Sequence, residues 1–253
     1  MILILILIIY LLYYNYKSKY NKIKPYLISK SHKNLLLKTL INTHNIFEKH
    51  DIFYVMEGGV LLGAIRDKSI IPWDDDADLL VLLKDKNKIL NLKDEFIKLG
   101  HDIKQLDRLL RIYCIKGKKY PFIDLFINDT ITNIKPKYNK FVKNNDLIRC
   151  TGSFKPSKFK CIDNCCIYPK NVKWWWKYNF KLNDLLPRKK YKLNEITLYG
   201  PNNPYPYIFT WYGINALNTY VFTHNHKSNE KKQDKIILTK EEYKKLQKYF
   251  FPY

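Results

Sequence analysis

The sequence is poor in the residue types that define small disulfide-stapled scaffolds. Only eight of its 253 residues are glycine and five are cysteine, which argues against a fold held together mainly by disulfides. Hydrophobic residues make up 46% of the chain, so it can bury a core and is not disordered throughout. The length suits one large domain, or one domain with appendages.

Acidic residues are also scarce. There are 23 Asp and Glu against 45 Lys and Arg, a formal net charge of +22. Such an excess favours anionic partners, such as nucleic acid, an anionic membrane or a phosphorylated substrate. No long block of Lys or Arg stands out, so a second interpretation stays open, in which the charge reflects a codon bias toward Lys, Asn, Ile and Tyr.

The N-terminus lacks the parts of a cleaved signal peptide. Residues 2–14 are wholly apolar or aromatic, with no basic segment before them and no small residues after them. As a helix this run spans only about 20 Å of a hydrocarbon core about 30 Å thick, and Tyr16 and Tyr20 could extend it into the interface. We therefore predict a single-pass membrane anchor through residues 2–16, rather than a cleaved signal or an arm packed on the domain. The lysines that follow favour a cytosolic domain but leave the side of the membrane open, and they complete an anchor segment of residues 1–24.

Four carboxylates lie within five positions at Asp74, Asp75, Asp76 and Asp78, and an apolar run of five residues follows directly. That run predicts a strand buried on both faces. If the strand extends back through the acids, Asp76 and Asp78 point to the same face. Two carboxylates so close repel each other unless a cation lies between them, and Mg²⁺ or Mn²⁺ would suit such oxygen ligands.

The surrounding pattern predicts an α/β domain (α+β in detail) with helices flanking a mixed sheet. Helical spacing covers residues 35–47, 60–66 and 87–99, the last ended by Gly100. Strand-like runs cover residues 53–56, 110–115 and 122–127.

Two further features point toward the acidic stretch. Asp124 interrupts an apolar strand, which is costly unless the acid is paired or ligates a metal, so it is a candidate third carboxylate. Gly58 and Gly59 lie between a strand and a helix, where backbone amides can approach a phosphate. An ordinary tight turn is the alternative for this pair.

The rest of the chain is less informative. Residues 130–170 are irregular and are predicted to form an insertion, in which Cys161, Cys165 and Cys166 could bind zinc. The paired C-x-x-C spacing is missing there, so a disulfide or free thiols remain open. Residues 174–176 are three tryptophans, suited to packing or to stacking on a base or sugar. Residues 227–253 read as a polar linker and a C-terminal helix that begins with a capping box at Thr239 and Glu242.

Two consecutive segments resemble the LicD family, which includes fukutin and fukutin-related protein. They are EGGVLLGAIR at residues 57–66 and IIPWDDDAD at residues 70–78. Looser matches follow at residues 123–126, 186–188, 201–203, 207–208 and 212–213, so the resemblance covers roughly residues 33–226. Ser69 departs from the family, which usually has glycine there.

The resemblance implies a nucleotidyltransferase-like catalytic domain over residues 25–226. It also implies transfer of a phospho-alcohol, such as phosphocholine or ribitol phosphate, from a CDP-linked donor to a glycan hydroxyl. By this pattern Asp76 and Asp78 would hold the metal, Asp124 would be the third carboxylate, and Gly58 and Gly59 would line the donor phosphates. Asp124 could also orient or deprotonate the attacking hydroxyl.

Arg66, Trp73, Asp74 and Asp75 are candidate substrate-binding residues, and the first two have two interpretations each. Arg66 could reach the donor phosphates, but pairing with Asp74 or Asp75 is favoured, which gives those acids supporting roles. Trp73 could stack on a base, but packing against the acidic turn is favoured.

A nucleotidyltransferase acting on nucleic acid would fit the charge and the expected fold. The N-terminal anchor and the LicD-like segments make nucleic acid a poor candidate for the partner. An inactive membrane-bound relative is a third alternative, and the presence of all three acids argues against it.

Overall fold

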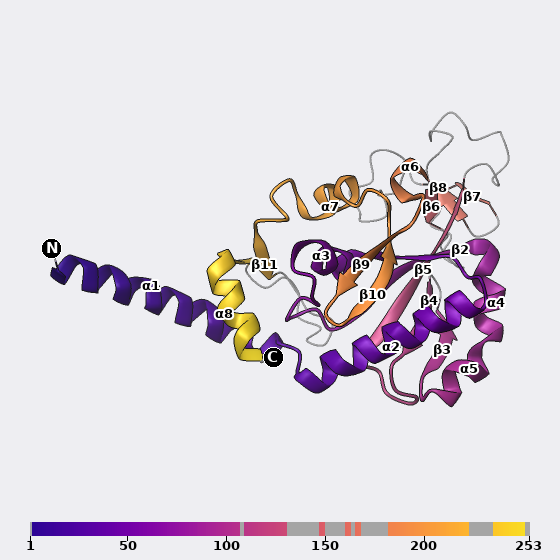
Figure 1. Ribbon diagram of the computed structural model, residues 1–253, viewed down its shortest axis with the longest axis horizontal. Helices are drawn as coiled ribbons and strands as arrows, with labels where there is room; N and C mark the ends of the chain where they lie inside the picture. The colour runs from indigo at the N-terminus through magenta and orange to yellow at the C-terminus, as the bar shows by residue number, and fades with distance from the viewer. Residues whose placement is uncertain are drawn as a thin grey trace.

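The fold is built around one mixed sheet with helices on both sides (Figure 1). The computed structural model describes residues 2–106, 109–130, 147–149, 160–162, 165–167, 182–222 and 235–250. Strands follow the order β1-β2-β5-β4-β3, with β6 paired to the far end of β5. Their bounds are Tyr54–Glu57 (β1), Ala77–Leu82 (β2), Asp102–Gln105 (β3), Leu109–Tyr113 (β4), Phe122–Thr130 (β5) and Leu147–Arg149 (β6). The α/β fold with a mixed sheet is therefore confirmed.

The centre of the sheet is the parallel pair β2 and β5, and the other pairings are antiparallel. Parallel neighbours need a crossover connection. Here the crossover runs through the 3₁₀ turn Leu83–Asp85, α4 (Lys86–Asn91), α5 (Lys93–Lys98), β3 and β4. Because both strands run the same way, their first residues meet at one edge of the sheet.

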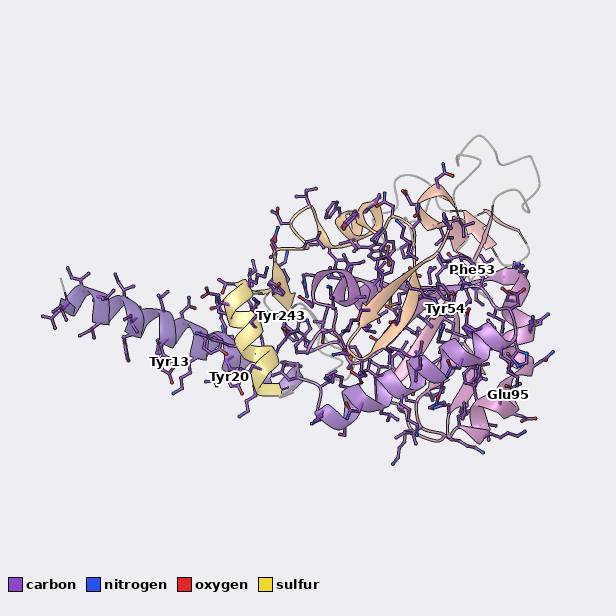
Figure 2. All side chains as sticks on the ribbon, in the orientation of Figure 1. Tyr13, Tyr20, Phe53, Tyr54, Glu95 and Tyr243 are labelled. Carbon is purple, nitrogen blue, oxygen red and sulfur yellow. The ribbon has the colours of Figure 1, made fainter. Side chains whose placement is uncertain are left out.

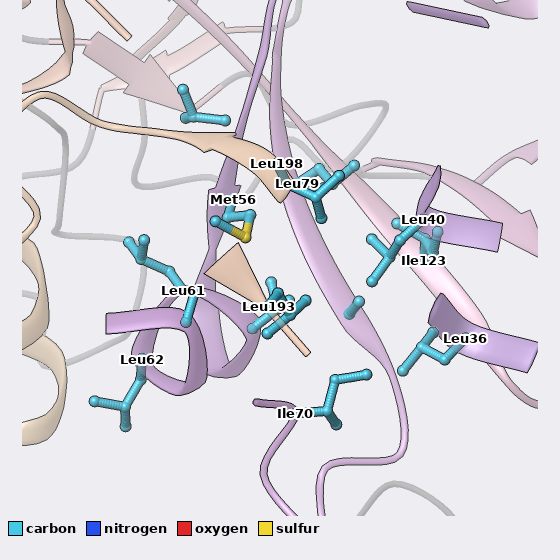
Figure 3. Packing of buried hydrophobic residues seen from close by; sticks show 14 of the residues in the cluster. Leu36, Leu40, Met56, Leu61, Leu62, Ile70, Leu79, Ile123, Leu193 and Leu198 are labelled. Atoms are coloured by element: carbon cyan, nitrogen blue, oxygen red, sulfur yellow. The ribbon is translucent and has the colours of Figure 1, made fainter. Parts of the chain in front are cut away.

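The helix α2 (Lys30–Lys49) crosses the sheet, and it is longer than the predicted residues 35–47. Ser29 caps it by accepting a hydrogen bond from the His32 amide (3.1 Å), the usual way to satisfy a free N-terminal donor. Its buried stripe includes Leu36 and Leu40, which face Ile123 of β5 (Figure 3).

The helix predicted over residues 87–99 is broken in two at Leu92. There the backbone reaches φ −85° and ψ 8°, which ends α4 and begins α5. The break interrupts the predicted continuous helix, although Ile89 and Phe96, seven positions apart, are both fully buried as the helical pattern predicts. Gly100, with φ +85°, ends the second helix as predicted.

Two hairpins and four further helices belong to the described fold. The hairpin β9 (Lys189–Leu193) and β10 (Ile196–Gly200) covers β1, where Leu193 and Leu198 contact the core beside Met56 (Figure 3). The hairpin β11 (Tyr220–Phe222) and β12 (Ile236–Leu238) leads into α8 (Lys240–Phe250). The short helix α3 (Gly58–Arg66) follows β1, and α6 (Leu182–Leu185) and α7 (Tyr205–Tyr212) flank the first hairpin in sequence.

The N-terminal helix α1 (Ile2–Ile23) is a single unbroken helix that projects from the domain (Figures 1 and 2). At 1.5 Å per residue it is about 33 Å long, longer than the apolar run alone suggested. Residues 2–14 are between 47% and 81% exposed. Its length and composition are sufficient to cross a membrane. Its base differs, because Tyr16, Lys19 and Tyr20 are partly buried and Ile23 is completely buried against the domain.

The predicted insertion at residues 130–170 and the tryptophans at 174–176 lie largely outside the described residues. Only the backbones of β6, β7 (Lys160–Ile162) and β8 (Cys165–Ile167) are described there. Cys161, Cys165 and Cys166 belong to the β7–β8 pair, but their side chains lie outside the description. The zinc site therefore stays a prediction.

Candidate active site

Three carboxylates from two neighbouring strands meet at one edge of the sheet. Asp76 directly precedes β2, Asp78 is its second residue, and the parallel register places Asp78 beside Asp124 of β5. One oxygen from each of the three lies within 4.8 Å of the others. The structure thus brings together the three acids that the sequence singled out.

The acids are held close in spite of their mutual repulsion. Asp76 and Asp124 are buried, and Asp78 is partly exposed. Burial, followed by the charges of the neighbouring carboxylates, raises the pKa of both Asp76 and Asp78. A hard divalent cation would remove this repulsion, and three carboxylate ligands match the preference of Mg²⁺ or Mn²⁺. The residues present therefore fit the metal that the sequence predicted.

Arg111 is a site residue that sequence reasoning missed. It lies on β4 directly opposite Asp124. Its Nε donates to one oxygen of Asp124 (2.6 Å) and an Nη donates to the other (2.9 Å), while its guanidinium covers the Phe122 ring. A bidentate pair of this kind fixes the carboxylate in orientation as well as in charge. The available signal was an arginine in an apolar, alternating strand next to the one that carries Asp124.

The glycine pair opens α3 beside these acids. Gly58 has φ +61°, a conformation that disfavours side chains, and a Cβ there would overlap the Asp78 carboxylate. A Cβ at Gly59 would overlap the Asp74 carboxylate in the same way. Both glycines are therefore needed for the acids to approach the helix N-terminus.

The amide of Gly58 is already used within the protein. It donates to the hydroxyl of Tyr207 (3.0 Å), and that hydroxyl donates to Glu57 Oε1 (3.3 Å). Tyr207, on α7, lies in one of the looser family matches, but the sequence did not predict this role for it. It ties α7 to the turn that carries the glycines.

The acidic turn is fixed by packing around Trp73. This residue is buried and lies edge-on to Phe222 (5.8 Å between ring centroids) and to Tyr243 (5.6 Å). Asp75 is also buried, and its backbone oxygen accepts a hydrogen bond from His32 Nε2 (2.9 Å). These contacts favour the packing interpretation of Trp73.

Arg66 does not pair with the acid that we expected. Its Nε donates to Asp67 (2.8 Å), and an Nη donates to the Thr219 backbone oxygen (3.1 Å). Its guanidinium also lies over the Tyr220 ring, 4.3 Å from the centroid. The expected pairing with Asp74 or Asp75 is wrong, because the segment at residues 216–220 folds over the end of α3 and engages the guanidinium there.

A cavity of about 660 Å³ opens in front of the acids. Asp74, Asp75, Asp76 and Asp78 line it, with Gly59, Arg66 and Trp73. Its apolar and aromatic lining residues include Trp211, Tyr212, Ile214 and Ile237. Gly58 and Asp124 are not among the lining residues.

Tyr212 stands where the aromatic wall approaches the acids. Its side chain is 43% exposed overall. Burial of the phenol group, and then the charges of Asp74 and Asp78, raise its pKa, so the hydroxyl stays protonated near neutral pH. It is therefore a hydrogen-bond donor facing the carboxylates.

The sequence has recognisable relatives in bacteria. It is 31% identical over 229 residues to an uncharacterised protein of Rickettsia typhi, covering 87% of this chain and 60% of that protein. It is 30% identical over 183 residues to an uncharacterised protein of Rickettsia prowazekii, covering 72% and 56% respectively. The lipopolysaccharide cholinephosphotransferase LicD of Haemophilus influenzae is 30% identical over 110 residues, which cover 37% of this chain and 41% of the relative. The chain thus matches less than two thirds of the length of each relative.

Among solved structures, the lincosamide antibiotic adenylyltransferase LnuA matches with a TM-score of 0.37 and 10% identity, over 69% of this chain and 81% of that one. This likeness is too distant to bear on function. Residues 51–203 match the profile of the LicD/FKTN/FKRP nucleotidyltransferase domain. That span is more than half of the chain and contains the three carboxylates, the glycine pair and Arg111. The chain therefore belongs to the LicD/FKTN/FKRP nucleotidyltransferase-domain family.

Proposed function

We propose that this protein is a metal-dependent transferase that moves a phospho-alcohol from a CDP-linked donor to a glycan hydroxyl. The observation that carries the proposal is the position of Asp76, Asp78 and Asp124 beside the N-terminus of α3. Family membership and the cholinephosphotransferase relative support the same reaction class.

The reaction breaks the phosphoanhydride bond of the donor and forms a phosphoester bond to the acceptor. The acceptor hydroxyl oxygen bonds to the phosphorus that carries the alcohol, the bond from that phosphorus to the bridging oxygen breaks, and CMP leaves. The hydroxyl proton passes to a base or to water. Such transfer relies mainly on positioning and charge neutralisation rather than on covalent help from the protein.

Each group of site residues has its own role in the proposed transfer. Asp76, Asp78 and Asp124 would hold a divalent cation, which would supply charge neutralisation at the donor phosphates. Gly59 lines the cavity near the start of α3, where the helix dipole favours negative charge, so the donor phosphates would lie there. Arg111 occupies both oxygens of Asp124, whose remaining lone pairs still allow ligation. A ligand role for Asp124 is therefore favoured over a role as the free base.

The cavity walls favour a cationic alcohol. Trp211 and Tyr212 line the same cavity as Asp74 and Asp75. Aromatic faces attract quaternary ammonium groups, and nearby carboxylates strengthen the attraction. We therefore rank phosphocholine ahead of ribitol phosphate as the transferred group.

The exposed apolar length of α1 supports a membrane location. We propose that residues 2–16 anchor the enzyme in a bilayer. A glycan or glycoconjugate acceptor would then be met at the membrane surface.

A panel of CDP-linked donors tests the reaction directly. The purified protein is incubated with CDP-choline or CDP-ribitol, with Mg²⁺, Mn²⁺ or a chelator, and CMP release is measured. We expect metal-dependent release with CDP-choline above that with CDP-ribitol. Metal-independent release, or no release from any donor in the presence of glycan acceptors, would contradict the proposal.

A further inference from the structure

The C-terminal helix α8 is attached to the base of α1. Lys19 of α1 contacts both carboxylate oxygens of Glu242 at 3.1 Å, and Lys245 lies over the Tyr16 ring at 5.8 Å. Tyr16, Lys19, Tyr20 and Ile23 form the one stripe of α1 that is partly or fully buried. The position of α8 relative to the N-terminal helix is therefore fixed by packing.

The inner face of α8 belongs to the domain. Tyr243 and Leu246 are buried. The Tyr243 ring stacks on Tyr220 with 4.1 Å between centroids, and its hydroxyl donates to Asp67 (3.0 Å). With this face occupied, α8 cannot turn its apolar side toward lipid.

The outer face of α8 is basic. Lys240, Lys244 and Lys248 are exposed and spaced four residues apart, so they lie along one side of the helix. Of the two acids in α8, Glu242 is paired with Lys19, which leaves Glu241 as the exposed one. Lys17, Lys22 and Lys24 are exposed at the base of α1.

The direction of α8 suits a membrane surface. It crosses the base of α1 steeply, with the domain on one side and the free apolar part of α1 on the other (Figure 1). If α1 runs along the bilayer normal, α8 lies close to the plane of the headgroups. Basic residues beside a membrane span are attracted to anionic lipids at that depth.

We infer that Lys240, Lys244 and Lys248 of α8, together with Lys17, Lys22 and Lys24, form a binding surface for anionic lipid headgroups. The inference rests on the membrane anchor proposed above, and it assigns α8 a partner of its own. Charge complementarity and the fixed attachment to α1 support a bilayer as the occupant.

The lysine surface on α8 lies close to the cavity. Tyr243 on the inner face of α8 contacts Trp73, which lines the cavity beside the acids. One layer of side chains therefore separates the basic face of α8 from the cavity wall. Binding of headgroups would hold the cavity next to the membrane surface.

Lysine footprinting on the full chain tests this surface. The protein is reconstituted in nanodiscs of phosphatidylcholine alone or with one quarter phosphatidylglycerol, and amine acetylation is quantified by mass spectrometry. We expect Lys240, Lys244 and Lys248 to be labelled at least about threefold less in the anionic discs. Lys84, Lys88 and Lys98 are exposed near α4 and α5, at the opposite end of the molecule, and should be labelled equally in both.

Matched variants separate lipid binding from other effects. K240Q/K244Q/K248Q should lose the lipid-dependent protection of the α8 amides from hydrogen exchange, whereas K84Q/K88Q/K98Q should keep it. Equal labelling of the α8 lysines in both discs overturns the inference. So does equal protection by inorganic phosphate in neutral discs, because the surface would then bind free anions. If the chain enters neither disc, the anchor and this inference are both overturned. If the α8 lysines are protected as expected but no CMP is released, only the proposed reaction is overturned.

Discussion

At the scale of single residues, Asp76 and Asp78 are placed where their charges oppose folding in the absence of metal. Their raised pKa values mean that the folded protein binds more protons than the unfolded chain between the ordinary and the raised pKa. The free energy of unfolding therefore falls as pH rises through that window. Metal ligation would reverse this penalty by stabilising the ionised form.

The first prediction concerns this repulsion. Without metal, the melting temperature should be higher at about pH 5.5 than at about pH 7.5, and Mg²⁺ should reduce the difference. D76N should melt at least about 2–4 °C above the native protein in chelator at the higher pH, because one buried charge is gone.

D76N and D78N should each lower transfer by more than about 100-fold. The metal-site assignment would be refuted if D76N melted at the same temperature as the native protein in chelator, or if either variant retained full turnover.

The second prediction concerns Arg111. R111Q should lower kcat by about 10–100-fold, because Asp124 loses both hydrogen bonds that orient it, and should raise the Mg²⁺ concentration needed for half-maximal rate. R111K should recover part of the rate. Arg188 is the matched control, since it covers the Tyr199 ring (3.9 Å) and pairs with Glu48 rather than with the three acids. Similar metal dependence in R111Q and R188Q would show that Arg111 does not position Asp124.

The third prediction separates backbone strain from close approach. Gly58 and Gly100 both have positive φ, +61° and +85°, but only Gly58 has a carboxylate where a Cβ would lie. G100A should cost about 1 kcal/mol, and G58A at least twice that with loss of transfer. Urea denaturation measures both values. Equal costs would mean that Asp78 can move away from the helix N-terminus without penalty.

The acids and the glycines could be recognised as site residues from the sequence, because each lies in a distinctive local pattern. Asp76 and Asp78 are adjacent to an apolar strand, and Asp124 is conspicuous within one. The partners of Arg66 and Arg111 could not be predicted, because they are set by strand order and by a distant segment folding back. Asp67 lies next to Arg66 in sequence, but Asp74 or Asp75 was the predicted partner because both belong to the dense run of acids that follows.

At the scale of elements, α1 combines two environments along one helix. Its first 13 residues in the structure are exposed and apolar, whereas Ile23 near its end is fully buried. A sequence window sees only the apolar run, whereas the helix continues to Ile23. The burial of Ile23 shows that the end of the helix packs against the domain.

The fourth prediction follows from this division. A chain lacking residues 1–14 should remain in the supernatant after ultracentrifugation and melt within about 2 °C of the full chain in detergent. A chain lacking residues 1–24 should melt at least about 5 °C lower, because it loses a buried isoleucine and the Lys19–Glu242 ion pair. Pelleting of the shorter deletion with membranes would contradict the anchor, and equal melting temperatures would contradict the packing of the helix base.

Other elements show the same limit on prediction. Helical periodicity continues across Leu92, and Ile89 and Phe96 are both buried as it predicts, but the backbone breaks between them. The capping box at Thr239 and Glu242 forms as predicted, with both reciprocal hydrogen bonds present. Local hydrogen bonding is thus readable from the sequence, whereas the break at Leu92 is not.

At the scale of the whole molecule, the parallel pairing of β2 and β5 is what assembles the site. Asp78 and Asp124 are 46 positions apart in the sequence yet lie side by side in the sheet. The aromatic lining residues Trp211 and Tyr212 come from the last fifth of the chain, where the sequence offered only loose family matches and no chemical role. Hence the acidic half of the site was predictable, and its aromatic half and its relation to α1 were not.

The fifth prediction is the central one, and it concerns which phosphorus of the donor is attacked. The full chain in detergent or lipid is given CDP-choline, Mg²⁺ and a glycan acceptor, and both products are identified by mass spectrometry, with D78N as the control. The acceptor should gain phosphocholine, with one CMP released for each transfer, and the D78N reaction should show neither product. An acceptor that instead gains CMP, with phosphocholine released, would show nucleotidyl transfer and contradict the account.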